Sequence, residues 1–270
     1  MRRSLRLTRL YFKEKTLKHK KLLVLGATAL ACGIASVYGG DCLVVGLDSS
    51  AGGEFADAMD CHPVDFSKLG AAGKELCDEL TARGVLNDRG ELHILALAGV
   101  FAKRFLDSGC ELLLSSTIIS VEKTGEGFLA TLFTAVDGYI QVLADEVIDT
   151  RVCESDLAGG CEKTFGVMLA GETCFGELPG AKIVKGFFDD EYVLRFEVPA
   201  EFSIPDAEKF ADEWLETNFA LLGKAKVVSI ALMFGCDSPE PLDYFRDGIR
   251  HIPSGAFSDA VSAFDKGASL

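Results

Sequence analysis

The sequence predicts an α/β protein in which a three-layer α/β domain is followed by a smaller α+β domain. Two short, wholly apolar segments, residues 22–25 and 42–47, flank an Ala-rich segment at 28–38. Apolar runs of this length are typical of parallel strands buried on both faces, and the segment between them has helical character. Of the 270 residues, 49% are apolar and 25% charged, as in ordinary globular proteins. That length accommodates one large or two modest domains.

The first sixty residues predict a β-α-β unit. Gly26 follows the first apolar segment and allows a tight turn, and Gly39-Gly40 ends the helix where a left-handed conformation is favoured. The second strand then ends at Asp48. A strand, a glycine turn, a helix and a parallel strand within about thirty residues form the unit from which nucleotide-binding sheets are built.

An amphipathic helix is expected next, at residues 93–108, where Gly109 ends it. Short apolar segments separated by glycine turns follow. They predict strands at 111–115, 117–123, 127–134, 139–144 and 146–150. This order indicates a parallel strand, an antiparallel excursion over 117–144 and a return strand in the first sheet.

The second half has a mixed pattern of strands and one long helix. Strands are expected at 164–169, 182–188, 192–198 and 226–234, with a helix at 206–222. A final strand at 248–252 and a helical run at 256–264 close the chain. Such a mixture predicts an α+β domain followed by a short return segment.

Charge is distributed unevenly along the chain. Residues 1–21 contain nine Lys and Arg and one Glu, which leaves 18 basic and 40 acidic residues in the other 249. A body with this excess of acid repels phosphate backbones, so nucleic acid is not an expected partner. Residues 1–20 are expected to form a solvated basic arm that folding does not need.

Residues 22–40 contain no charged side chain and follow a basic stretch, which is also the outline of an exported or membrane-anchored protein. Four glycines and the apolar run directly after this segment favour a cytoplasmic protein instead. The nine cysteines have irregular spacing and no Cys-x-x-Cys pair. They are therefore expected to be reduced thiols, and neither a disulfide framework nor a metal site is predicted.

The opening segment resembles the FAD-dependent oxidoreductases of the glutathione-reductase-like superfamily, the flavoproteins with two dinucleotide-binding domains. Their pattern is a strand, Gly-x-Gly-x-x-Gly, a strand ending in an acid, and a Gly-Gly pair. Here Gly26, Thr28 and Ala31 take the three glycine positions, and Gly52-Gly53 is the pair. The ribose-binding acid falls at Gly46, and Asp48 is the nearby substitute.

The resemblance extends over roughly residues 20–155. The family motif Ala-Thr-Gly after the return strand corresponds to Thr150-Arg151-Val152, and Val121 takes a position that lies along the adenine. The resemblance therefore implies a Rossmann-like FAD/NAD(P)-binding domain at 21–155, a substrate-type domain at 156–245 and a return segment at 246–270. It implies FAD contacts from Gly26, Ala27, Thr28, Ala31, Asp48, Gly52, Gly53, Val121 and Thr150.

Two functions remain open. The first is an FAD-dependent oxidoreductase that transfers a hydride from an unidentified small molecule to flavin. The second is a degenerate relative with weak or no FAD binding that acts as a binding or interaction protein, because Thr28, Gly46 and Val152 replace motif residues. No catalytic residue is assigned, since the flavin carries the chemistry in this class. His62, His93, His251 and Cys61 are expected to be structural or surface groups.

Overall fold

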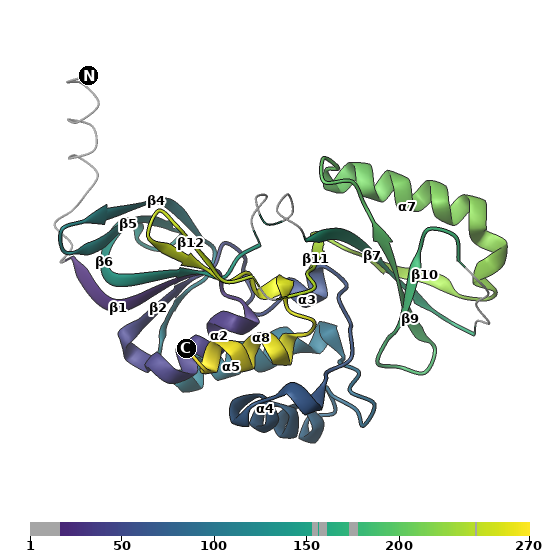
Figure 1. Cartoon of the computed structure of the whole chain (residues 1–270), viewed down its shortest axis with the longest axis horizontal. Helices are drawn as coiled ribbons and strands as arrows, with labels where there is room; N and C mark the ends of the chain where they lie inside the picture. The colour runs from purple at the N-terminus through teal and green to yellow at the C-terminus, as the bar shows by residue number, and fades with distance from the viewer. Residues whose placement is uncertain (1–16, 153–155, 157–160, 173–177, 241) are drawn as a thin grey trace.

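The computed structural model describes residues 17–152, 156, 161–172, 178–240 and 242–270 (Figure 1). These residues form two β-sheets that lie side by side, each covered by helices. The predicted α/β fold class is confirmed.

The first sheet has eight strands in the described residues, in the order β12-β13-β6-β1-β2-β3, with β5 pairing β6 and β4 pairing β5. Its central strands pair in parallel, whereas the β4-β5-β6 excursion is antiparallel. The strands are β1 (Lys18–Leu25), β2 (Cys42–Val45), β3 (Glu111–Leu113), β4 (Ser116–Thr124), β5 (Gly127–Thr134), β6 (Gly138–Asp149), β12 (Tyr244–Arg246) and β13 (Ile249–His251).

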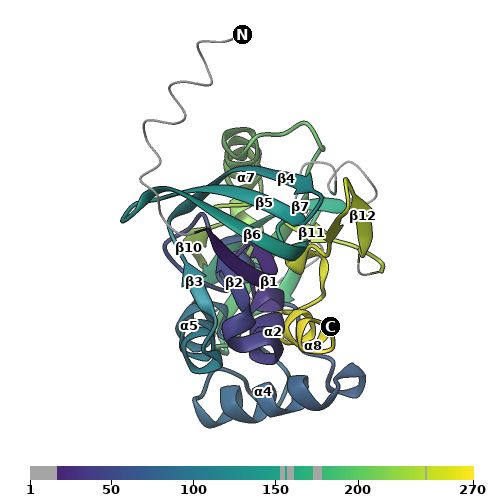
Figure 2. The ribbon, with the colours of Figure 1, turned by 90° about the vertical axis from the view of Figure 1, so that its left-hand side faces the viewer.

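Strand β1 is buried on both faces, which explains its continuous apolar sequence. Leu22 and Val24 belong to the core on the helical side, whereas Leu23 and Leu25 pack against the antiparallel excursion. Figure 2 shows α2 (Ala29–Tyr38), α5 (Leu97–Ser108) and α8 (Ala260–Ala268) below β1 and β2, and β4 to β6 above them. Helices, parallel sheet and antiparallel strands thus make the predicted three layers.

Helices α2 and α8 touch through two glycines. A Cβ atom on Gly33 would lie 2.0 Å from the carbonyl oxygen of Phe264, and one on Gly267 would lie 2.1 Å from that of Leu30. Side chains at either position would force the helices apart. The last helix is therefore held against the helix of the β-α-β unit.

The second sheet has the order β10-β7-β9-β8, with β11 also paired to β7. Helix α7 covers it, and the rings of Phe196 and Trp214 lie 5.3 Å apart between helix and sheet. The elements are β7 (Glu162–Ala170), β8 (Lys182–Lys185), β9 (Glu191–Glu197), α7 (Ile204–Asn218), β10 (Lys226–Ile230) and β11 (Gly235–Asp237).

Two helices were not among the predicted elements, α3 (Glu54–Asp57) and α4 (Ala71–Ala82). Helix α4 lies outside α8, where the carboxylate of Asp265 accepts bonds of 2.7 Å from the amides of Gly70 and Gly73. Short 3-10 turns connect several elements: Gly39–Asp41, Phe66–Lys68, Ile94–Ala96, Phe219–Leu222 and Ser254–Ala256.

Several sequence-based boundaries need correction, and three of them have an evident structural cause. Strand β1 begins at Lys18, so the end of the expected arm 1–20 is paired with β6, while residues 1–16 lie outside the described residues. The strands expected at 139–144 and 146–150 are one strand, since β6 pairs with β5 on one edge and β1 on the other. The final helix starts at Ala260 because Asp259 accepts bonds from two amides there.

The membrane-anchor alternative for residues 22–40 is not supported. This segment contains the end of β1, a turn, the ten-residue helix α2 and a 3-10 turn rather than one long helix. Within the described parts of the chain, no helix combines the length and apolar character needed to cross a bilayer.

Candidate dinucleotide site

A pocket of about 210 Å³ lies where β1, β2 and β6 end, at the N-terminus of α2. The carboxyl edge of a parallel sheet is where open α/β folds bind ligands. Six of the nine residues implied by the resemblance line it: Gly26, Ala27, Thr28, Asp48, Gly53 and Thr150. The pocket is smaller than the roughly 300 Å³ at which ligand sites begin, so it matches only part of a dinucleotide.

The other three implied residues lie outside the lining. Ala31 is buried inside α2, and Gly52 has a positive φ of 66° and donates its amide to Ala27. Val121 lies on β4 and packs against the core between the sheet and the excursion. The structure thus brings together the turn residue Gly26, the acid Asp48 and Thr150 after the return strand. Val121 is not part of the pocket lining.

Gly26 forms the turn between β1 and α2 with a φ of 102°. A Cβ atom here would lie 2.7 Å from the hydroxyl of Thr150 and 2.8 Å from Cγ of Arg151. Its amide donates to the carbonyl of Val45 on the neighbouring strand, at 2.8 Å. Only glycine satisfies this backbone conformation and this close approach.

Thr28 caps α2. Its hydroxyl accepts a hydrogen bond of 3.1 Å from the amide of Ala31 and donates one of 2.8 Å to the hydroxyl of Thr150. Thr150 in turn donates to the carbonyl of Leu25 at the end of β1. Both threonines are buried. Thr28 stands at a glycine position of the first family motif, and Thr150 is the first residue of the second, so this hydrogen bond joins the two motifs.

Glu54 was missed by the sequence analysis and lies at the same helix end. Its Oε1 accepts bonds of 2.7 Å from the amide of Ala29 and from the hydroxyl of Ser254. Ser254 also accepts from the amide of Leu30, at 3.2 Å. Burial raises the pKa of Glu54, and these hydrogen bonds offset part of that effect. The sequence feature that could have pointed to Glu54 is its position directly after the Gly52-Gly53 pair.

The pocket lining is acidic. Asp48, Glu54 and Asp57 all line it, and burial, with a smaller effect of Asp48, raises the pKa of Asp57. Arg151 also lines the pocket, but its guanidinium holds Asp149 through bonds of 2.9 and 2.7 Å. Three carboxylic side chains and one guanidinium thus line this pocket.

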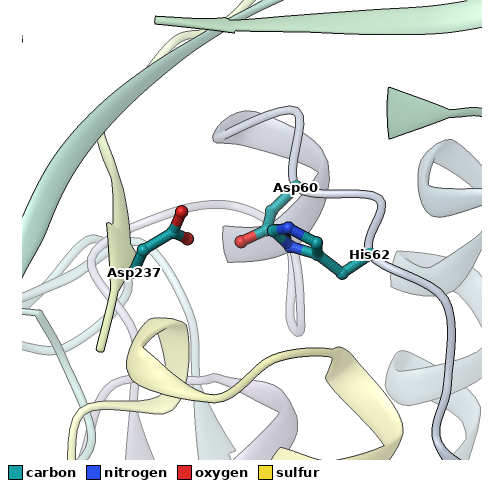
Figure 3. Close-up of side chains that lie close together, drawn as sticks. All are labelled: Asp60, His62 and Asp237. Carbon is teal, nitrogen blue, oxygen red and sulfur yellow. Dashed lines mark hydrogen bonds and ion pairs between the residues drawn. The ribbon is translucent and has the colours of Figure 1, made fainter. Parts of the chain in front are cut away.

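A second cluster of charged side chains connects the segment after α3 to the second sheet. Figure 3 shows Asp60, His62 and Asp237 close together. One carboxylate oxygen of each acid and one ring nitrogen of His62 lie within 4.8 Å of one another. Arg195 from β9 lies among them, with Nη1 3.2 Å from Asp60 and Nη2 2.6 Å from Asp237. The Arg195 side chain is 5% exposed. A guanidinium thus supplies the positive charge between the two carboxylates.

The histidine of this cluster is held between an acid and the arginine. Its Nδ1 lies 2.7 Å from Asp60, and its Nε2 lies 2.9 Å from Nη1 of Arg195. Burial alone would raise the pKa of Asp60, but the His62 hydrogen bond and the Arg195 charge hold it below its usual value. Nη1 of Arg195 also lies 2.6 Å from Nδ1, so both ring nitrogens of His62 lie against charged partners.

The expectation that all cysteines are reduced thiols is wrong for one pair. Cys161 and Cys236 form a disulfide with Cα atoms 5.5 Å apart, although 75 positions separate them in sequence. Pairing of β7 with β11 sets Cys236 opposite Lys163 and so beside Cys161, a proximity that spacing alone does not reveal. Cys61 is buried, and burial raises the pKa of its thiol to about 12.

No protein-family model and no curated protein sequence matches the chain. Solved structures do match. A geranylgeranyl bacteriochlorophyll reductase-like protein from Thermoplasma acidophilum aligns with a TM-score of 0.56 at 12% identity, over 93% of this chain and 77% of that one. The L-amino acid deaminase of Proteus vulgaris aligns at 0.54 and 11% identity, over 96% and 89%.

An aklavinone-11 hydroxylase, solved with FAD and aklavinone, aligns at 0.51 and 13% identity, over 95% of this chain and 61% of that one. The chain spans 55% of an aromatic hydroxylase from angucycline biosynthesis. It thus covers little more than half the length of some of these enzymes. The fold of the chain is that of FAD-binding oxidoreductases, with a Rossmann-like core and a second, smaller sheet.

Proposed function

We propose that this chain is an FAD-dependent oxidoreductase-like protein that oxidises a small molecule. The observation that carries the proposal is the pocket at the N-terminus of α2, where Gly26, Thr28, Asp48 and Thr150 converge in a flavoprotein fold. The amide groups and dipole of a helix N-terminus favour phosphate there. The finer assignment to the glutathione-reductase-like superfamily rests on the order of the motifs along the chain.

The residues present fit the adenosine half of FAD better than its diphosphate. Gly26 allows the tight turn between β1 and α2, and Asp48 offers an exposed carboxylate for a ribose hydroxyl. Glu54, in contrast, already accepts the hydrogen bond of the Ala29 amide at the start of α2. Bound flavin would accept a hydride from the substrate. The chain's own contribution is to hold the dinucleotide, and the segment after β10 adds Met233 to the pocket wall.

The second sheet is proposed to bear the substrate, within a domain at residues 156–245. Strands β12 and β13 then return the chain to the first sheet. The segment after β10 also contacts the first domain, where the amides of Leu232 and Met233 donate to the carbonyl of Asp57. A substrate bound on this side would meet the part of the cofactor that extends beyond the pocket.

A second function is favoured by one observation, the acidic lining of the pocket. A relative that has lost FAD would keep the α/β shell and act as a binding or interaction protein. Three carboxylates around the phosphate position, with Arg151 bonded to Asp149, are consistent with that outcome.

A titration separates the two functions. The purified chain would be titrated with FAD and, as a matched control, with FMN, which lacks the adenosine half. Saturable binding of FAD with flavin absorption bands, at least about tenfold tighter than FMN, supports the oxidoreductase. A colourless protein that ignores both flavins would overturn it in favour of the second function.

A further inference from the structure

Three amides at the N-terminus of α2 already have side-chain acceptors. An α-helix begins with unsatisfied backbone N–H groups, and these are what dinucleotide diphosphates normally occupy. Here the amide of Ala29 donates to Glu54, that of Leu30 to Ser254 and that of Ala31 to Thr28. Glu54 and Ser254 come from distant parts of the chain, whereas Thr28 is the N-cap of the helix itself.

Two of these three acceptors are neutral hydroxyls, but the third is a carboxylate. Thr28 already caps the helix, so Glu54 is not needed to begin it. Glu54 instead places an anionic group on the first amide, 2.7 Å away, and receives a second bond of 2.7 Å from Ser254. A carboxylate that accepts from a helix amide and a hydroxyl has the recognition chemistry of a bound phosphate.

We propose that Glu54 is an internal anion that occupies the diphosphate position of the dinucleotide site. FAD then enters only when this carboxylate leaves the N-terminus of α2. The inference rests on the proposed function, because it names the step that limits cofactor binding at the same site.

The surrounding charges make this competition direct. Asp57 is on the same short helix as Glu54, and both Asp57 and Asp48 line the same pocket. Among the described lining residues Arg151 is the basic one, and it is bonded to Asp149. A diphosphate and the Glu54 carboxylate would therefore repel each other at this helix end, while the positive charge of Arg151 is shared with Asp149.

The test compares Glu54→Ala and Glu54→Gln with Asp57→Asn. The alanine variant leaves the amide of Ala29 without its acceptor, and the glutamine variant removes the negative charge while keeping an acceptor oxygen. The control removes a carboxylate from the same lining without touching the α2 amides. Each protein would be titrated at pH 7.5 with FAD and, separately, with inorganic pyrophosphate, by calorimetry and by thermal shift.

Glu54→Ala is expected to bind both ligands at least about tenfold more tightly than the wild type, with Glu54→Gln showing a smaller gain. Asp57→Asn is expected to change either affinity by less than about threefold. Gain of pyrophosphate binding without any FAD binding would support the inference and overturn the proposed function. If neither Glu54 variant binds FAD or pyrophosphate more tightly than the control, the inference is wrong, whether or not the wild type binds FAD.

Discussion

The hydroxyl of Thr28 donates a hydrogen bond of 2.8 Å to the hydroxyl of Thr150, which joins the first turn of α2 to the end of β6. Thr150 passes the connection on to the carbonyl of Leu25. The two loops that a dinucleotide would contact are therefore fixed to each other before any ligand binds. Because these loops are already fixed without a ligand, binding a dinucleotide would cost less conformational entropy.

Thr28→Val is predicted to destabilise the protein by about 2 kcal/mol, because it removes the cap of α2 and leaves the buried Thr150 hydroxyl without its donor. Thr28→Ser is the matched control. It keeps the hydroxyl and is expected to cost less than about 1 kcal/mol. Urea unfolding followed by circular dichroism measures both. A smaller loss of stability in Thr28→Val than in Thr28→Ser would show that the methyl group, rather than the hydrogen bonds, matters at this site.

The close approach of α2 and α8 gives a second prediction. Gly33→Ala is expected to destabilise the chain by about 3 kcal/mol or more, since the new Cβ would lie 2.0 Å from the carbonyl oxygen of Phe264. Gly99→Ala on α5 is the control, because a Cβ there meets no atom within 4 Å. That variant is expected to stabilise by roughly 0.5–1 kcal/mol. A mild effect of Gly33→Ala in urea unfolding would mean that the helices separate easily.

The strands and helices of the first sheet were largely predictable because their signals are local. Leu22 to Leu25 are apolar without interruption, which indicates burial on both faces, and Gly109 ends α5 with the left-handed φ of 73° expected of a helix cap. Gly26 likewise forms the turn expected between the first strand and the helix, with a φ of 102°.

What escaped prediction depends on residues far apart in sequence. Glu54 meets Ser254 across 200 positions, and Arg195 meets Asp60 across 135. The disulfide joins Cys161 and Cys236 only because β7 and β11 pair. A local pattern identifies a buried strand, but a charged partner appears only when the sheets are assembled.

The raised pKa of Glu54 predicts a pH dependence of stability. A carboxyl whose folded pKa lies above its unfolded value, roughly 4.3 for Glu, contributes stability below that value and loses it as pH rises through the folded pKa. The wild type should therefore lose stability relative to Glu54→Gln on going from acidic to neutral pH. Melting temperatures of both proteins between pH 4 and pH 8 measure this. A difference that stays constant with pH would contradict the raised pKa.

The buried charge cluster gives the last prediction. Arg195→Met is expected to destabilise the protein by about 3 kcal/mol or more, because Asp60 and Asp237 lose the cation between them and Asp60 is buried. The control is Lys224→Met. The Lys224 side chain is 80% exposed, and its ion pair with Glu172 is expected to contribute less than about 1 kcal/mol to stability. Since Arg195 provides the positive charge, treating the wild type with EDTA should leave its melting temperature unchanged. A clear fall in melting temperature on chelation would show instead that a metal ion, held by Asp60, His62 and Asp237, stabilises the contact between the two sheets.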